Sequence, residues 1–100
     1  MNNGLNHSDL LEISNQVKKF PEIKSVYLFG SRAKGNFKAG SDVDLALFGD
    51  TIDTETTLKL SYLLNEETNM PYQFDILNYQ SLSELHLKEH ITRVGIKIYP

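Results

Sequence analysis

FGSRAKGNFKAGSDVDLAL, residues 29–47, is the stretch around which the rest of the chain is organised. It starts with a glycine and a serine that follow an apolar run, and it continues through a basic loop with two further glycines. It ends in a strand-like segment that carries two aspartates one residue apart. A turn, a basic loop and paired acids in one short stretch indicate a site for a charged ligand.

The two aspartates are predicted to lie on the same face of a β-strand. Residues 42–48 read DVDLALF, which is rich in strand-forming and apolar residues. Because side chains alternate along a strand, Asp42 and Asp44 share one face, about 7 Å apart, and Val43 lies on the other with the leucines. Neighbouring carboxylates resist joint ionisation unless a cation lies between them, and Mg²⁺ prefers such oxygen ligands. Taken alone, this pattern is also compatible with a solvated strand end.

The segment before the aspartates supplies groups that bind anions. Residues 25–29, SVYLF, form an apolar run that predicts a buried strand ending at Gly30. A glycine lets backbone N–H groups approach a phosphate closely, and a neighbouring serine adds a hydroxyl donor. Arg32 and Lys34 place two positive charges on the same loop. Gly30, Ser31 and Arg32 are therefore predicted to bind phosphates, although each residue taken singly is also compatible with a solvated loop.

These motifs resemble those of the polymerase-β-like nucleotidyltransferase superfamily. The quoted pattern is Gly30-Ser31, ten residues, and then Asp42-x-Asp44, and the short forms GSRAKG and SDVDLAL are similar to its minimal nucleotidyltransferase (MNT) branch. The resemblance covers about residues 17–99. It implies a third carboxylate on a neighbouring strand, and Asp75 in the apolar run QFDIL, residues 73–77, matches that requirement.

The resemblance also implies an activity and a partner. Asp42, Asp44 and Asp75 would be the catalytic and metal-binding residues, with two Mg²⁺ ions, in an enzyme that transfers AMP from ATP to a hydroxyl. MNT proteins are similar to the antitoxin halves of two-gene modules whose partner is a HEPN-domain protein, often a toxin. The implied acceptor is a tyrosine of such a partner, held in a hetero-oligomer.

Two alternatives to this activity remain open. The chain is short for such an enzyme and has no room for a second domain that presents the acceptor, so we expect a separate protein to supply that surface. A weak or silent site would leave a binding module that neutralises its partner by occlusion, although all the acids and the glycine–serine turn are present. Nucleotidylation of a small molecule is the other alternative, and the missing acceptor domain argues against it.

Bulk properties favour one ordinary globular domain. The 100 residues, 40% hydrophobic and 23% charged, suggest a single domain over residues 1–100, with 1–7 disordered. The resemblance implies that it is a minimal nucleotidyltransferase domain. The net charge of −3 does not favour a broad nucleic-acid-binding surface. Without cysteine there is no disulfide or thiolate metal site. No signal peptide or membrane-spanning run is evident, so we expect a cytoplasmic protein without membrane contact.

Hydrophobic periodicity predicts an α/β (α+β) fold, a small mixed sheet with helices packed on one face and the acids on the open face. Strands are expected at residues 23–29, 42–48 and 72–78, with an edge strand at 96–99. Helices are expected at residues 9–20, 31–34, about 54–67 and about 82–94. Ser8 would cap the first of these, Asp53 or Thr54 the third, and a capping box of Ser81 and Glu84 the last.

The remaining candidate residues favour structural roles. His86 and His90 stand four residues apart on a predicted helix, but no third metal ligand is evident, so surface histidines are the favoured interpretation. Tyr79 follows the third strand and is interpreted as a core or rim residue rather than a base-stacking platform. Residues 65–67, NEE, are interpreted as a solvated helix end.

Overall fold

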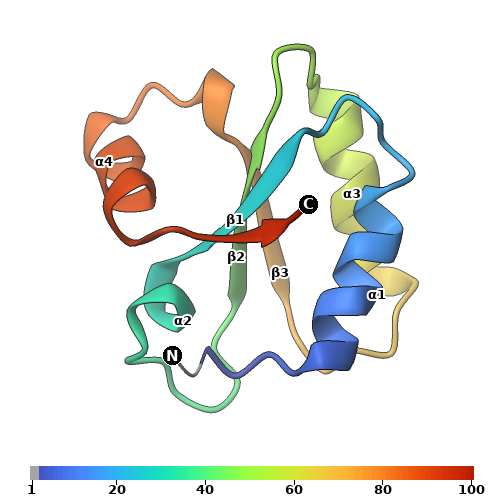
Figure 1. Ribbon diagram of the computed structural model, residues 1–100, viewed down its shortest axis with the longest axis vertical. Helices are drawn as coiled ribbons and strands as arrows, with labels where there is room; N and C mark the ends of the chain where they lie inside the picture. Colours follow the sequence, from blue (N-terminus) through green and yellow to red (C-terminus); the bar gives the residue numbers. More distant parts are fainter. Residues whose placement is uncertain (1–2) are drawn as a thin grey trace.

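Four short strands form one mixed sheet in the computed structural model, which describes residues 3–100 (Figure 1). Their spatial order is β3-β2-β1-β4. The first strand is antiparallel to both of its neighbours, and the second is parallel to the third. This confirms the predicted mixed sheet and the edge position of the last strand. The bounds are Ser25–Phe29 for β1, Val43–Phe48 for β2, Phe74–Asn78 for β3 and Ile96–Tyr99 for β4.

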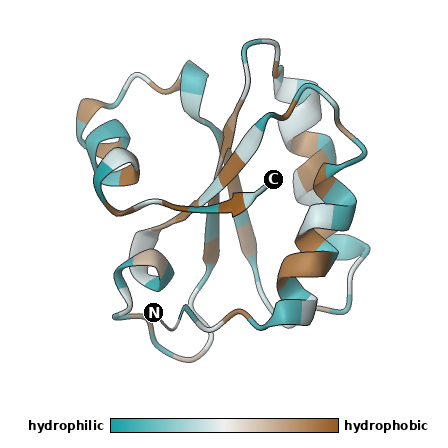
Figure 2. Ribbon diagram, viewed as in Figure 1, coloured by the Kyte–Doolittle hydropathy of each residue, from teal (hydrophilic) through white to brown (hydrophobic). Residues whose placement is uncertain are grey.

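The first face of the sheet carries the main core. Val43, Leu45 and Leu47 of β2 are fully buried, as alternation along the strand predicts. They pack with residues of helix α1, His7–Val17, and helix α3, Thr54–Glu66. Figure 2 shows hydrophobic segments along the central strands and on parts of both helices. The central strand is thereby anchored through its first face.

Helix α4, Leu85–Val94, packs on the second face of the sheet, so helices cover both faces (Figure 1). Ile91 of this helix is buried against Phe29 and Ala46. Ala46 lies two residues after Asp44 on β2, and Phe29 is the partner of Asp44 in the ladder. Both therefore share the second face with the aspartates. The fold class is as predicted, but this apolar patch was overlooked. At the end of this face that carries the acids, Asp42 and Asp75 are exposed.

The first helix begins and ends earlier than predicted. Asn6, and not Ser8, is the N-cap: its side chain accepts the Asp9 N–H at 2.8 Å, and the Asp9 carboxylate accepts the Asn6 N–H at 3.0 Å. The helix ends at Val17, and a tighter turn follows. Residues 3–7 lead into this helix and include its first residue, residues 1–2 lie outside the described residues, and the expected disorder of 1–7 stays a prediction.

Two further helix starts test the capping predictions. Asp53 caps α3 and accepts the Thr56 N–H at 2.8 Å, as predicted. The capping box of Ser81 and Glu84 is wrong. Ser81 lies in the short 3₁₀ helix η1, Tyr79–Ser81, while Glu84 itself is the N-cap of α4 and accepts two backbone N–H groups at 3.0 Å. Among residues 3–100, no helix is long and apolar enough to cross a membrane.

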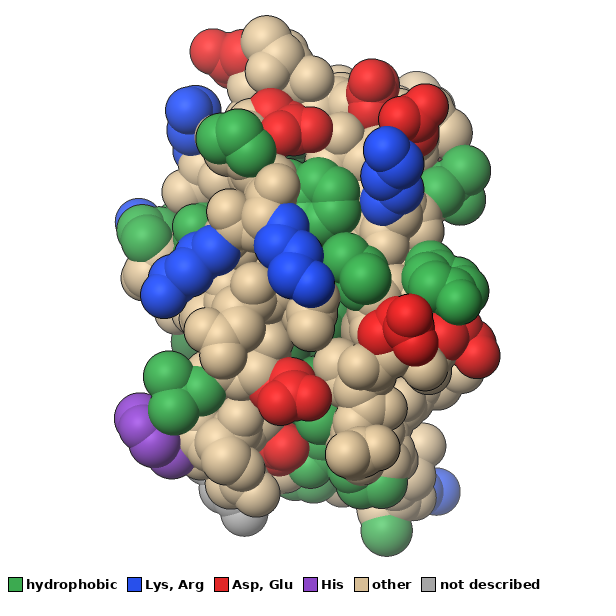
Figure 3. Space-filling view, turned by 90° about the vertical axis from the view of Figure 1, so that its right-hand side faces the viewer, with side chains coloured by type: hydrophobic (Ala, Val, Ile, Leu, Met, Phe, Trp, Pro, Cys, Tyr) green, Lys and Arg blue, Asp and Glu red, His purple; other side chains and the backbone are tan. Residues whose placement is uncertain are grey.

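The outer side of α1 and α3 carries apolar side chains among charged ones (Figure 3). Leu58 and Tyr62 are 65% and 58% exposed. Together with Phe20 and Leu63 they line an open groove of about 360 Å³, with Glu55 and Lys59 at its edge. This groove lies on the side of the molecule formed by α1 and α3, away from the sheet face that carries the acids.

Candidate active site

The three predicted acids gather at one end of the second face. Asp44 on β2 and Asp75 on β3 are direct partners in the parallel ladder, so their Cα atoms lie about 4.8 Å apart. Asp42 precedes β2 by one residue. Asp44 is half-buried, while Asp42 and Asp75 are exposed. The structure thus brings residues 42, 44 and 75 together, on the side of the sheet that alternation predicts.

The Asp44 carboxyl has a raised pKa. Burial is the largest cause, followed by the charges of Asp75 and Asp42, and together they raise its pKa from 3.8 to about 6, against the opposing charge of Arg32. Ionised Asp44 is therefore held close to like charges. A bound cation would relieve this repulsion, which is the electrostatic setting expected at a site that works on phosphates.

Gly30 allows the turn after β1 to approach this carboxylate. Its φ is +75°, and a Cβ atom there would overlap Asp44 Oδ2. Its N–H, predicted to face a phosphate, donates instead to Nε2 of His90 at 3.1 Å. The close approach to Asp44 requires glycine at this position, but its amide already has a partner within the protein.

Arg32 binds the backbone of the loop, a contact the sequence did not indicate. Its Nε and Nη2 donate to the Ser41 carbonyl at 3.2 and 2.9 Å, and its Nη1 donates to the Asn3 carbonyl at 3.0 Å. The guanidinium is buried between the rings of Phe37 and Tyr72, 4.9 Å from each centroid. The geometry gives Arg32 a structural role in the glycine-rich loop, in place of the direct phosphate contact expected from its charge.

Helix α2, Gly30–Lys34, carries the serine of the motif. The Ser31 carbonyl accepts the N–H groups of Gly35 and Asn36 at 3.0 and 3.2 Å, which fixes the turn that follows. Lys34 is exposed at the end of this helix. An open pocket of about 320 Å³ lies on the acid-bearing face, and its lining residues are Phe29, Asp44, Asp75, Ile76 and Leu77.

The donor chemistry of this pocket fits Mg²⁺ bound with a nucleotide. Among residues 3–100, no group of three or more His, Cys, Asp or Glu side chains is arranged to hold a metal ion by itself. Mg²⁺ is usually bound by one or two carboxylates together with substrate phosphates and waters. The adjacent pair Asp44 and Asp75 supplies two such carboxylates, and the raised pKa of Asp44 marks a place where added positive charge is favourable.

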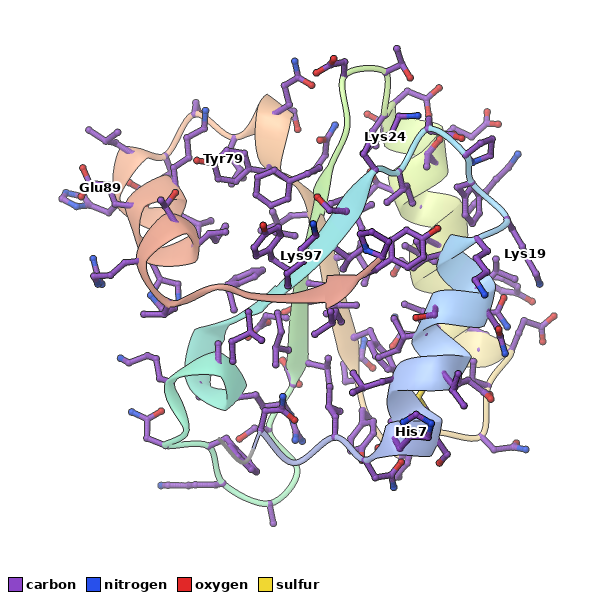
Figure 4. All side chains as sticks on the ribbon, viewed as in Figure 1. His7, Lys19, Lys24, Tyr79, Glu89 and Lys97 are labelled. Carbon is purple, nitrogen blue, oxygen red and sulfur yellow. The ribbon has the colours of Figure 1, made fainter. Side chains whose placement is uncertain are left out.

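Tyr79, which follows the third strand, lies outside the acid pocket. Figure 4 shows Tyr79 between α4 and the sheet. It lies at the same end of the sheet as Lys24, and α2 lies at the other end. It stacks on Phe48 with ring centroids 4.4 Å apart, and Lys88 lies 5.3 Å from its ring. Tyr79 is thus a rim residue, as interpreted, and does not line the acid pocket.

His90 is the functional candidate that sequence reasoning missed. His86 is exposed, as expected, but His90 is half-buried and accepts the Gly30 N–H. The spacing of the two histidines gave only a weak hint. The contact joins residues 60 positions apart, and no local pattern reports such a pairing.

The family can be assigned from the sequence that builds this site. Residues 12–100 match the family model "Polymerase beta, Nucleotidyltransferase". The chain belongs to the polymerase beta nucleotidyltransferase family. The match confirms the enzyme class that the glycine–serine and aspartate motifs implied. No curated protein matches the chain.

Solved structures with the same fold include toxin–antitoxin complexes. A toxin–antitoxin crystal structure with AMP-PNP matches this nucleotidyltransferase with a TM-score of 0.75 and 23% identity, over 90% of this chain and 72% of that chain. A mutant MntA–HpeT toxin–antitoxin complex matches at 0.72 and 21%, over 94% and 73%. A structure of a tri-AMPylated HEPN toxin with its MNT antitoxin, from Shewanella oneidensis, matches at 0.61 and 21%, over 89% and 71%. At these identities the likeness establishes the fold.

Proposed function

We propose that this nucleotidyltransferase transfers AMP from Mg²⁺-bound ATP to a tyrosine hydroxyl of a HEPN-domain toxin and thereby acts as an antitoxin. The observation that carries the proposal is the pairing of Asp44 with Asp75 in the ladder, next to a glycine whose missing side chain makes room for the Asp44 carboxylate. Three acids close together at an exposed end of the second face suit a ligand that binds together with cations.

The roles of the residues follow from their positions. Asp42, Asp44 and Asp75 would hold Mg²⁺, which when bound supplies positive charge to the phosphates in the transition state. Ser31 would donate its hydroxyl to a phosphate oxygen, and Gly30 would keep the turn close enough for that contact. Asp75, the exposed acid on the neighbouring strand, would accept the proton of the attacking hydroxyl.

The proposed transfer exchanges one phosphorus–oxygen bond for another. The acceptor oxygen forms a bond to the α-phosphorus while the bond from this phosphorus to the oxygen bridging to the β-phosphate breaks. Pyrophosphate leaves with the electron pair of the broken bond, and the hydroxyl proton goes to the carboxylate. Positioning of the two reactants and stabilisation of the phosphate charge account for the rate, with little further chemistry required of the protein.

The neighbouring structures support both the donor and the acceptor. One of them is a toxin–antitoxin complex with AMP-PNP, and another contains an AMPylated HEPN toxin bound to its MNT antitoxin. The chain is similar to these proteins over nine-tenths of its length or close to it. The same activity in this chain requires a HEPN-domain partner encoded by its host.

Mass spectrometry of the partner tests the proposal. The HEPN-domain protein of the host is incubated with the chain, ATP and Mg²⁺, and a gain of AMP on a tyrosine is expected. Asp42→Asn should reduce this transfer by about a hundredfold or more, because a metal-binding carboxylate is lost. Asp50→Asn is the matched control, since Asp50 is an exposed aspartate just after β2 and lines a different pocket.

The same experiment separates catalysis from occlusion. Undiminished AMP transfer by Asp42→Asn would remove the metal role of this residue. Neutralisation of the partner by the wild-type chain without nucleotide, with no gain of AMP, would instead favour the binding module. Failure to recover any HEPN-domain protein with the chain from its host would count against the proposed partner.

A further inference from the structure

Helix α4 contributes one side chain to the glycine–serine turn. His90 accepts the Gly30 N–H at its Nε2 atom, and the two residues lie 60 positions apart in the chain. The imidazole also meets the ring of Phe29 edge-on, with centroids 6.1 Å apart and an interplanar angle of 80°. The neighbouring Ile91 is buried against the sheet, so the helix that carries the imidazole is anchored.

Gly30 is thereby held from two sides. The Asp44 carboxylate occupies the space that a Cβ atom would take, and His90 holds the N–H. Ser31 follows directly in the chain, so any shift of Gly30 changes both the packing of the Asp44 carboxylate and the position of the serine. One imidazole on α4 is therefore linked through a single glycine to two groups of the proposed nucleotide site.

The imidazole is in the state that this contact requires. Burial, followed by the positive charges of Lys34 on α2 and Arg93 on α4, lowers the pKa of His90. The ring is therefore neutral at physiological pH, and its lone pair at Nε2 accepts the amide proton. In this tautomer the ring proton is on Nδ1.

We propose that His90 is a positioning residue for the nucleotide: by accepting the Gly30 N–H it holds the glycine–serine turn against Asp44 in the geometry that a nucleoside triphosphate with Mg²⁺ requires. The inference rests on the proposed function and deepens it. It gives α4, which otherwise covers an apolar part of the second face, a role in substrate binding. His90 acts through Gly30 and makes no contact with the reacting atoms.

Titration calorimetry with AMP-PNP and Mg²⁺ tests the proposal. We expect His90→Ala to weaken binding by about tenfold, the order expected when one hydrogen bond to a positioned amide is lost. His90→Gln should stay within about threefold of wild type, because an amide oxygen can replace Nε2 as the acceptor. His86→Ala is the matched control, because His86 is exposed one turn earlier on the same helix, and it should bind as wild type does.

The outcomes distinguish this inference from the proposed function. If the wild-type chain binds no AMP-PNP, the proposed function fails and the role of His90 fails with it. If the wild type binds and His90→Ala binds equally well, with only a lower melting temperature, His90 is merely structural and the inference alone is wrong. Tighter binding by His90→Ala would show that the imidazole competes with phosphate for the amide, which also overturns it.

Nuclear magnetic resonance covers the case in which His90→Ala does not fold. In the free wild-type chain, the ¹⁵N shifts of the imidazole should report an unprotonated Nε2, and the Gly30 amide proton should move when His90→Gln is introduced. A proton on Nε2 in the neutral wild-type ring would contradict the contact. The expectation that glutamine replaces His90 as the acceptor can also fail. It is contradicted if the folded His90→Gln protein binds AMP-PNP at least tenfold more weakly than wild type and its Gly30 amide proton does not move.

Discussion

At the scale of single residues, Gly30 is the position at which the turn and the acids meet. Its φ of +75° disfavours any side chain, and the Asp44 carboxylate fills the space beside its Cα atom. Gly40 has a similar φ of +83° but nothing within 4 Å of the place where a Cβ would stand. The two glycines thus share the backbone strain that a substitution introduces and differ only in the steric overlap.

This pair predicts different losses of stability. Gly40→Ala should lower the free energy of unfolding by about 1 kcal/mol through its positive φ alone. Gly30→Ala should lower it by about 2–4 kcal/mol, because the Asp44 carboxylate must also move. Urea denaturation of both variants measures the difference. Equal losses would mean that the carboxylate moves away at no cost and that glycine is not required at position 30 for packing.

Asp44 predicts a pH dependence of stability. Its pKa is raised to about 6 in the folded chain, so between pH 3.8 and 6 the native state binds more protons than the unfolded state. Stability therefore falls as pH rises through this window, and the destabilisation is complete above it. Without metal, Asp44→Asn should be more stable than wild type by about 1 kcal/mol at pH 7.5, after allowing for solvent screening of a half-exposed carboxylate.

The same substitution should give little gain at pH 3.5, where the Asp44 carboxyl is protonated in the folded chain and mostly protonated in the unfolded chain. Thermal unfolding at the two pH values, with chelator present, measures the effect. Asp50→Asn is the control, because Asp50 is exposed and lies outside the acid cluster. An equal gain in stability at both pH values would contradict the conclusion that the ionised Asp44 carboxylate destabilises the fold.

At the scale of elements, α3 sets the position of Asp75. The helix connects β2 to β3 and lets them run parallel, which brings Asp75 next to Asp44. Asn65, near the end of the helix, accepts the Phe74 N–H at 2.7 Å and donates to the Phe74 carbonyl at 3.1 Å. Its side chain therefore fixes the first residue of β3, and the interpretation of this helix end as a solvated face is wrong for Asn65.

We predict that Asn65→Ala destabilises the chain by about 2 kcal/mol, because two backbone groups at the start of β3 lose their partner. It should also weaken binding of AMP-PNP with Mg²⁺, since Asp75 follows directly in the chain. Asn69→Ala is the control, an exposed asparagine in the loop between α3 and β3. Chemical denaturation and calorimetry measure the two effects. If a destabilised Asn65→Ala chain binds the nucleotide as tightly as wild type, Asn65 of α3 does not influence the site.

At the scale of the whole molecule, the site is formed where two covered faces of the sheet leave one end open. Helices α1 and α3 bury the first face and α4 buries part of the second (Figure 1), while Asp42 and Asp75 are exposed. A ligand that binds only this native arrangement stabilises the fold by mass action. Nucleotide binding should therefore be visible as a change in the global melting temperature.

We predict that AMP-PNP with Mg²⁺, at about a hundred times its Kd, stabilises the fold by about 2.7 kcal/mol and raises the Tm by roughly 10 °C or more at pH 7.5. The shift should shrink below pH 6, because binding then requires Asp44 to lose a proton. Differential scanning fluorimetry measures it, with chelator in place of Mg²⁺ as the control. An equal shift with chelator, or with Asp42→Asn, would contradict a metal-dependent site.

How much of the site was predictable depends on how local its contacts are. Alternation along β2 places Asp42 and Asp44 on the face opposite the leucines, and it places Asp75 on the matching face of β3. Cap positions were less secure, because several polar residues near a helix start compete for the same N–H groups. The first helix is accordingly capped by Asn6 rather than by Ser8.

The amino-acid sequence by itself determined which segments are strands and which side of β2 and β3 carries the acids, because both depend on periodicity over a few residues. It also determined the family, through the glycine–serine turn and its spacing to the aspartates. Only the tertiary structure decided that α4 covers the second face, that Arg32 binds the Asn3 carbonyl and that His90 holds Gly30. These contacts join segments far apart in the chain, and packing of the whole molecule selects them.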